Sequence, residues 1–145
     1  MLTSIIWATD GSEFADHALP FVEELAKAFS ARVTVVHVDQ RLIGRAAGYP
    51  VYADEPAIIE KIREQTARLT EAGFDATCTT VTGTVHAPAD LIADVAREID
   101  ADLIVVGSHG HGFLTAALAG SVTTRLLHVA PCPVFAVPAR VPVPA

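Results

Sequence analysis

Short runs of apolar, largely β-branched residues constrain the fold of this chain more than any other feature of its sequence. Residues 5–8, 33–38 and 103–106 form such runs, without the strict apolar and polar alternation of a strand that has one solvated face. They predict parallel strands that are covered on both faces. Residues 134–137 predict another strand, and the threonine-rich residues 74–82 predict a strand at the edge of the sheet.

Four segments with the apolar spacing of helices separate these strands. Parallel neighbours need a crossover connection, and helices supply it, so the alternation predicts an α/β fold with a parallel sheet. Pro20 lies inside the first helical segment, and we expect it to bend that helix. Further signals are an N-cap at Asp54, first-turn prolines at Pro56 and Pro88, a stop at Gly73, and a last helix over residues 121–129.

Three polar or glycine positions come directly after predicted strands. Asp10, Asp39 and Gly107 therefore lie at the carboxyl edge of the sheet whatever the strand order, and ligands of open α/β sheets bind at that edge. Residues 39–53 form a connection longer than the usual length of about four to six residues, and loops of that kind are often functional.

A glycine-rich stretch follows the strand predicted at residues 103–106. Its first part has glycines at relative positions 0, 3 and 5 from Gly107, whereas the dinucleotide-binding fingerprint needs 0, 2 and 5 after a first strand. A Walker-type loop is excluded as well, because the stretch contains no lysine. Its second part, Gly120 and Ser121, precedes the last helix, whose unsatisfied N–H groups favour an anion such as phosphate.

A spacing motif joins the two parts of this stretch, Gly107-x2-Gly110-x9-Gly120-Ser121. It resembles the nucleotide-binding signature of the universal stress protein family, to which residues 5–12 and 130–134 are similar as well. The resemblance implies a five-stranded parallel sheet in the order 3-2-1-4-5 with helices on both faces, the adenine nucleotide alpha hydrolase-like fold. In that order the first and fourth strands are neighbours, which brings Asp10 beside Gly107.

The resemblance also implies which residues contact a nucleotide. An aspartate at the position of Asp10 contacts the nucleoside, and the backbone at the position of Val38 meets the adenine edge. The glycines and Ser121 match phosphate-contacting positions. The implied set is Ala8, Thr9, Asp10, Val38, Gly107, His109, Gly110, Gly120, Ser121 and Val122, the last through its amide.

Most of these residues also have an ordinary structural interpretation. Asp10 would start a turn with Gly11, Val38 would fill the core, and the glycines would form a tight turn and a helix cap. A turn explains each glycine separately but not two clusters joined by nine residues, so we favour the phosphate interpretation.

The histidines and Arg125 leave alternatives open. His109 and His111 either project toward phosphates or form a His-x-His metal site, which we disfavour because no third ligand accompanies them at a defined spacing. Arg125, one helical turn beyond Ser121, either reaches a phosphate or lies on a solvated face. The scattered histidines have the pattern of ordinary polar or half-buried residues, namely His17, His37, His86 and His128.

The net charge of the chain limits which classes of molecule it can bind. A net charge of −7 and a pI near 5.2 disfavour nucleic acid and anionic membranes as partners. They also imply that a bound polyphosphate such as ATP uses local amides and Mg²⁺ or Mn²⁺.

A length of 145 residues predicts one domain over residues 1–145, with an extended tail at residues 138–145. We expect a cytoplasmic protein with two reduced thiols, because it has no long apolar stretch and its two cysteines are unpaired by spacing.

Three functions from different classes fit these observations. The first is a nucleotide-binding regulatory dimer, the second a stress-response scaffold without nucleotide, and the third a slow ATP hydrolase. The hydrolase is the weakest, because phosphoryl transfer needs cations at the transferred group, and the only lysines, Lys27 and Lys61, lie on other predicted helices. The intact glycine spacing favours the first, with ATP, ADP, AMP and cyclic nucleotides all possible as the ligand.

The last strand bears on assembly. Residues 133–137 contain no charge and are bracketed by Pro133 and Pro138, which makes the strand an open template for pairing. We expect it to lie at a sheet edge and to pair with its copy in a homodimer, as the resemblance also implies. In the competing arrangement, residues 139–145 fold back over that edge and keep the chain monomeric.

Overall fold

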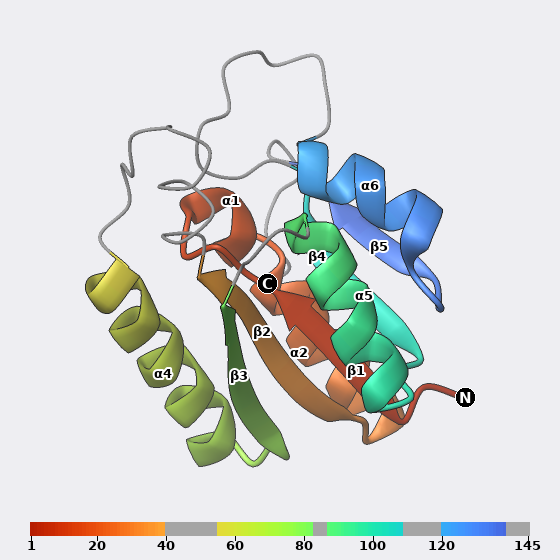
Figure 1. Cartoon of the computed structure of the whole chain (residues 1–145). Helices are drawn as coiled ribbons and strands as arrows, with labels where there is room; N and C mark the ends of the chain where they lie inside the picture. Colours follow the sequence, from red (N-terminus) through yellow and green to blue (C-terminus); the bar gives the residue numbers. More distant parts are fainter. Residues whose placement is uncertain (40–54, 83–86, 109–119, 139–145) are drawn as a thin grey trace.

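The computed structural model describes residues 1–39, 55–82, 87–108 and 120–138. Its centre is a five-stranded sheet in the order β3-β2-β1-β4-β5 (Figure 1), which confirms the predicted order. All neighbouring strands pair in parallel, so their carboxyl ends share one edge. The strands are β1 (Ser4–Ala8), β2 (Arg32–Asp39), β3 (Ala76–Thr82), β4 (Leu103–Gly107) and β5 (Val134–Val137).

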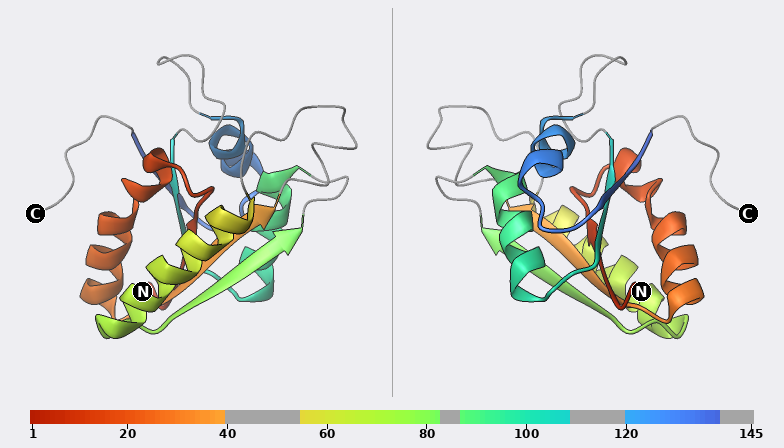
Figure 2. Two further views of the ribbon diagram at one scale, coloured as in Figure 1. Left: turned by 90° about the vertical axis from the view of Figure 1, so that its left-hand side faces the viewer. Right: turned by 90° about the vertical axis from the view of Figure 1, so that its right-hand side faces the viewer.

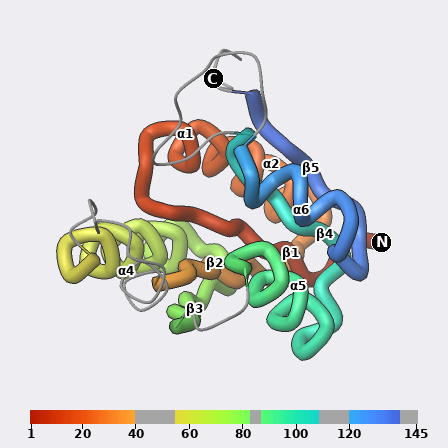
Figure 3. The backbone as a smooth tube through the Cα atoms, turned by 45° about the horizontal axis from the view of Figure 1, so that its top comes forward, coloured from red at the N-terminus to blue at the C-terminus, as the bar shows by residue number. Residues whose placement is uncertain are grey.

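Helices cover both faces of the sheet, as Figure 2 shows from its two sides. The first face carries α1 (Glu13–Asp16), α2 (Leu19–Phe29) and α4 (Glu55–Glu71), and the second carries α5 (Pro88–Glu98) and α6 (Ser121–Val129). The tube in Figure 3 shows the sheet between these two groups of helices. The fold is therefore the predicted three-layer α/β arrangement.

Successive residues of β1 divide between two hydrophobic cores. Ile5 and Trp7 belong to the cluster that packs against α2 and α4, whereas Ile6 and Ala8 belong to the cluster under α5 and α6. Every residue of β1 and β4 is buried, which explains the apolar runs at residues 5–8 and 103–106. β3, in contrast, is largely exposed at one end of the strand order, as its threonines predict.

The first helical segment differs from the prediction. Instead of one helix bent at Pro20, the chain forms the short helix α1 and then α2, which starts at Leu19. Pro20 is the second residue of α2, where the N–H that proline lacks would have no intrahelical acceptor. The predicted bend is wrong because the proline begins a helix rather than interrupting one.

The structure confirms the two predicted first-turn prolines and the predicted glycine stop. Pro56 lies in the first turn of α4, Pro88 begins α5, and Gly73 follows α4 with a φ of +97°, which glycine adopts without strain. The predicted cap at Asp54 lies outside the described residues. No helix in the described part of the chain combines the length and apolar character that a membrane span requires.

Candidate functional site

The ends of β1 and β4 are neighbours at the carboxyl edge of the sheet. Ala8 pairs with Val106, so the turn that begins at Thr9 emerges beside Gly107. β2 flanks the other side of β1 and continues past its end through Val38, which is buried. The sheet topology thus brings three of the predicted site segments to one place.

Side-chain hydrogen bonds hold the turn after β1. Thr9 Oγ1 accepts from the N–H of Gly11 at 3.1 Å, and Asp10 Oδ1 accepts from the N–H of Ser12 at 2.9 Å. Ser12 Oγ accepts from the N–H of Ala15 at 3.2 Å and so caps α1. The turn-forming interpretation of Asp10 is therefore real, and it is compatible with a ligand contact because a carboxylate accepts several hydrogen bonds.

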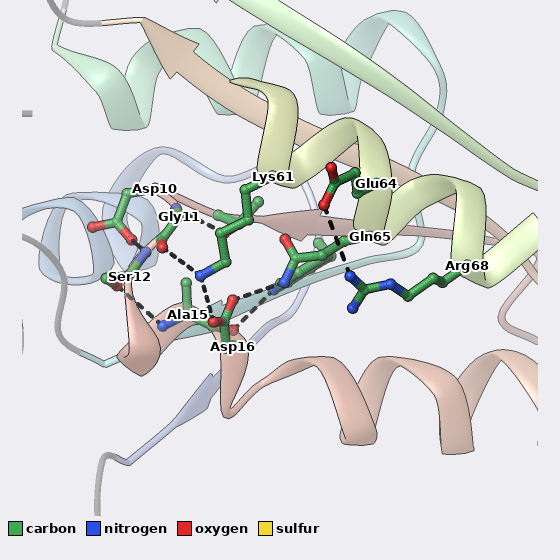
Figure 4. A network of polar contacts seen from close by, with 11 residues as sticks. Asp10, Gly11, Ser12, Ala15, Asp16, Lys61, Glu64, Gln65 and Arg68 are labelled. Carbon is green, nitrogen blue, oxygen red and sulfur yellow. Dashed lines mark hydrogen bonds and ion pairs between the residues drawn. The ribbon is translucent and has the colours of Figure 1, made fainter. Parts of the chain in front are cut away.

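One face of α4 packs against this turn (Figure 4). Lys61 Nζ donates to the carbonyl oxygen of Gly11 at 2.8 Å and pairs with Asp16 Oδ2 at 2.6 Å. Gln65 Nε2 donates to the other oxygen of Asp16 at 2.9 Å. Gly11 has a φ of +80°, and a Cβ added there would lie 2.8 Å from Cγ2 of Ile58. Contacts with α4 therefore support the turn, and the contact with Ile58 together with the positive φ explains why position 11 is glycine.

A buried polar pair connects the start of α4 to the end of β1. His37 of β2 lies with Nδ1 3.0 Å from the carbonyl oxygen of Thr9 and Nε2 2.8 Å from Oε2 of Glu55. The two residues are only 2% and 5% exposed. The sequence pattern predicts His37 to be an ordinary polar or half-buried histidine, and no pattern in it points to Glu55. The available signal was a histidine inside a run predicted to be buried on both faces, which needs a polar partner.

The start of α6 lies against the end of β4. The N–H of Gly120 donates to the carbonyl oxygen of Ser108 at 2.5 Å, which holds these two residues together. Gly120 is the N-cap, and Ser121 and Val122 are the first two residues of α6, so their amides lack intrahelical acceptors. The predicted site residues His109 and Gly110 lie outside the described residues, as does His111.

Gly107 is small for a reason that involves no ligand. A Cβ at this position would lie 2.7 Å from the carbonyl oxygen of Phe14, because the backbone of α1 approaches the end of β4 closely. Thr123 Oγ1 of α6 donates to the carbonyl oxygen of Gly107 at 2.9 Å. Close helix packing thus explains this glycine, whereas Gly120 has φ −59° and ψ 155°, a conformation open to any residue.

Arg125 of α6, the candidate cation for a phosphate contact, is already part of an ion pair. Arg125 pairs with Asp90 of α5 at 3.2 Å, which agrees with the solvated alternative rather than with a phosphate contact. In residues 1–39, 55–82, 87–108 and 120–138, no group of three or more His, Cys, Asp or Glu side chains is placed to hold a metal ion. Backbone amides at the start of α6 are therefore the main attraction for an anion in the described part of the site.

The chain is similar in sequence to proteins of one known family. The family model described as Universal stress protein family matches residues 1–138. A universal stress protein of Thermus aquaticus, named for the 3′ region of QAH/OAS sulfhydrylase, is 31% identical over 143 residues. The match covers 94% of this chain and 99% of the relative.

Two solved structures share the fold. A universal stress protein in complex with cAMP has a TM-score of 0.69 and 26% identity, with 95% of this chain and 98% of that chain covered. The universal stress protein from Archaeoglobus fulgidus in complex with dAMP has a TM-score of 0.66 and 25% identity, with 94% and 97% covered. Both of those proteins were therefore solved with a nucleotide that contains adenine.

Proposed function

This chain belongs to the universal stress protein family, and from that premise we propose that it binds an adenine nucleotide at the carboxyl edge of β1 and β4. One observation carries the proposal. The N–H of Gly120, at the start of α6, donates a hydrogen bond to Ser108, which follows β4. Because β4 neighbours β1, this contact lies close to the turn that contains Asp10. This junction offers helix amides to a phosphate and a carboxylate to a nucleoside in one place.

The absence of a side chain at Gly120 supports the phosphate half of the proposal. Its backbone conformation does not require glycine, unlike those of Gly11 and Gly73, which have positive φ. A small residue there leaves room for close approach of an anion to the first amides of the helix. Phosphate contacts are assigned to Gly107, His109, Gly110, Gly120, Ser121 and Val122.

The nucleoside half rests on the end of β1 and the end of β2. Asp10 accepts from a ribose hydroxyl or an adenine amine, and the backbone of Val38 meets the adenine edge, with Ala8 forming the floor of the site. Thr9 has a supporting role, because its N–H donates to Val36 and its carbonyl oxygen faces His37. These bonds hold Thr9 in place while its neighbour Asp10 contacts the ligand.

The proposed ligand is ATP with Mg²⁺ or Mn²⁺. The family members solved with cAMP and dAMP support an adenosine phosphate in general. The cation follows from charge: the chain has a net charge of −7, and a divalent ion reduces the repulsion of a triphosphate. The same net charge argues against nucleic acid as a partner.

We also propose a homodimer through β5. The N–H of Ile104 donates to the carbonyl oxygen of Pro133, and the N–H of Ser108 donates to that of Val137. The backbone N–H and C=O groups of the odd-numbered residues in this strand therefore point toward β4. The backbone groups of Val134 and Ala136 consequently point to the open edge of the sheet. An uncharged strand with this orientation can continue the sheet into a second copy.

Calorimetric titration tests the nucleotide proposal. ATP, ADP, AMP and cAMP are titrated separately into folded protein, each with and without Mg²⁺ or Mn²⁺. Mass spectrometry of the small molecule released from protein purified under mild conditions identifies any nucleotide that copurifies. We expect saturable binding of ATP that the cation strengthens. The absence of binding heat for all four ligands at millimolar concentration, from protein shown to be folded, would refute the proposal and favour the nucleotide-free scaffold.

A further inference from the structure

The protonation of His37 follows from its two partners. The carbonyl oxygen of Thr9, 3.0 Å from Nδ1, can only accept a hydrogen bond, so Nδ1 carries a proton. The second contact, 2.8 Å from Nε2 to Oε2 of Glu55, then contains one proton, which either nitrogen or oxygen can hold. In both cases His37 donates to Thr9 and is itself oriented by Glu55.

The consequence for Thr9 is that both of its backbone groups are held by β2. Its N–H donates to the carbonyl oxygen of Val36 at 3.0 Å, and its carbonyl oxygen accepts from His37. The peptide bond between Thr9 and Asp10 is planar, so fixing the direction of this carbonyl also fixes the direction of the next N–H and the position of the Asp10 Cα. His37 thereby helps to fix the Cα position from which the Asp10 side chain extends.

Stability alone does not explain a polar pair at this depth. Burying a histidine and a glutamate removes both from water, and well-packed apolar residues of similar volume are often as stable or more stable. An apolar residue at position 37 would, however, leave the carbonyl of Thr9 without its side-chain donor. The pair therefore contributes something that apolar packing cannot, which is a defined orientation of this peptide.

We propose that His37, oriented by Glu55, is a positioning residue for the nucleoside end of the site, acting through the Thr9–Asp10 peptide without touching the ligand. The assignment rests on the proposed nucleotide function. It also links the start of α4 to nucleotide affinity, because Glu55 is the first residue of that helix. Glu55 and His37 are 18 residues apart in the sequence, and only the fold brings them together.

A pair of isosteric substitutions separates the two contacts of His37. The amide nitrogen of Asn occupies the place of Nδ1 and keeps the donor to Thr9, whereas that of Gln occupies the place of Nε2 and loses it. Both His37→Asn and His37→Gln are made in a Glu55→Gln background, so that no unpaired carboxylate is buried. Glu55→Gln alone is the reference, since its amide can still donate to Nε2 of the imidazole.

The readout is the dissociation constant for Mg²⁺–ATP, with urea denaturation of each variant in parallel. We expect Glu55→Gln and its His37→Asn derivative to bind within about threefold of wild type, and the His37→Gln derivative to bind roughly tenfold more weakly, the effect of one lost hydrogen bond. Comparable stability of the two derivatives would show that the difference concerns positioning. If the His37→Gln derivative folds poorly, Glu55→Leu replaces it, with binding expected to be severalfold weaker than in Glu55→Gln.

The outcomes distinguish this assignment from the function on which it rests. Wild-type protein that binds ATP, with equal affinities in the Asn and Gln derivatives, overturns the role of His37 and leaves the nucleotide site intact. Wild-type protein that binds no nucleotide overturns the proposed function and the positioning role with it.

Discussion

The ammonium group of Lys61 lies 2.8 Å from the carbonyl oxygen of Gly11, which ties the middle of α4 to the turn after β1. The same ammonium group pairs with Asp16 at the end of α1. The sequence predicts Lys61 on a helix other than the one that follows the glycine stretch, and in the structure this helix supports the Asp10 turn.

Lys61→Met should lower the free energy of unfolding by about 1 kcal/mol, because it removes the hydrogen bond to Gly11 and the partly exposed ion pair with Asp16. The control is Arg68→Met on the same helix, whose pair with Glu64 spans 3.8 Å between largely exposed groups and should contribute less than about 0.5 kcal/mol. Urea denaturation measures both. Equal losses in the two variants would show that the contact with Gly11 contributes nothing.

Gly11→Ala should destabilise the protein by about 2 to 3 kcal/mol, since its positive φ and a Cβ placed 2.8 Å from Ile58 act together. Gly73→Ala is the matched control: its φ is +97°, but nothing lies within 4 Å of the added carbon, so only the backbone strain of about 1 kcal/mol remains. Thermal denaturation compares them. A loss at position 11 no larger than that at position 73 would mean that α4 does not press on the turn.

Gly120→Val should weaken ATP binding at least tenfold while the fold survives. Valine is compatible with the backbone conformation of Gly120, so the added branched side chain acts mainly by keeping phosphate away from the start of α6. Calorimetry measures the affinity, and circular dichroism checks the fold. Unchanged affinity in a folded variant would place the anion elsewhere.

Ala136→Pro should convert a dimer into a monomer. The N–H that proline lacks points to the open edge of the sheet, whereas the N–H groups of Ile104 and Ser108 donate to Pro133 and Val137. We therefore expect the fold of each chain to be preserved. Phe135→Lys is a less specific alternative, because the Phe135 ring also lies 5.7 Å from that of Phe21. Light scattering at equal concentration decides the matter, and a wild-type mass near 15.3 kDa would refute the dimer.

Asp102→Asn should destabilise the protein at neutral pH but not in strong acid. Hydrogen bonds from the backbone N–H and hydroxyl of Thr3 and from the N–H of Ser4 hold the pKa of Asp102 below its ordinary value of 3.8. A lowered pKa contributes stability that is complete above the ordinary value and disappears as the pH falls through the folded value. The melting temperatures of variant and wild type should therefore converge below pH 3.8. A gap that stays constant with pH would contradict this account.

The two cysteines behave as their sequence context predicts. Cys78 is exposed on β3 and Cys132 is partly buried, and both are free thiols. Burial, with a smaller effect from the charge of Asp102, raises the pKa of the Cys132 thiol, so it stays protonated at neutral pH. Neither thiol takes part in the proposed site.

Apolar patterning along the chain was enough to predict the layers of the fold and the sheet edge at which we expect a ligand. Apolar periodicity reports how deeply each strand is buried, and this is why β1 and β4 could be recognised as central and β3 as an edge. The signature glycines and Asp10 could be singled out as candidate site residues because turns and helix starts need particular residues locally. The strand order came from the family resemblance, since no local pattern encodes it.

Which residues lie around the candidate site, in contrast, depends on how the whole chain packs. Glu55 meets His37 and Lys61 meets Gly11 because α4 crosses the sheet at one particular position, and that position depends on the packing of Ile58, Ile62 and Leu69. The local sequence around Pro20 is likewise the same whether proline interrupts a helix or begins one. Periodicity tells which face of an element is buried, but the partner on the other side depends on how two elements pack, and that is a property of the whole chain.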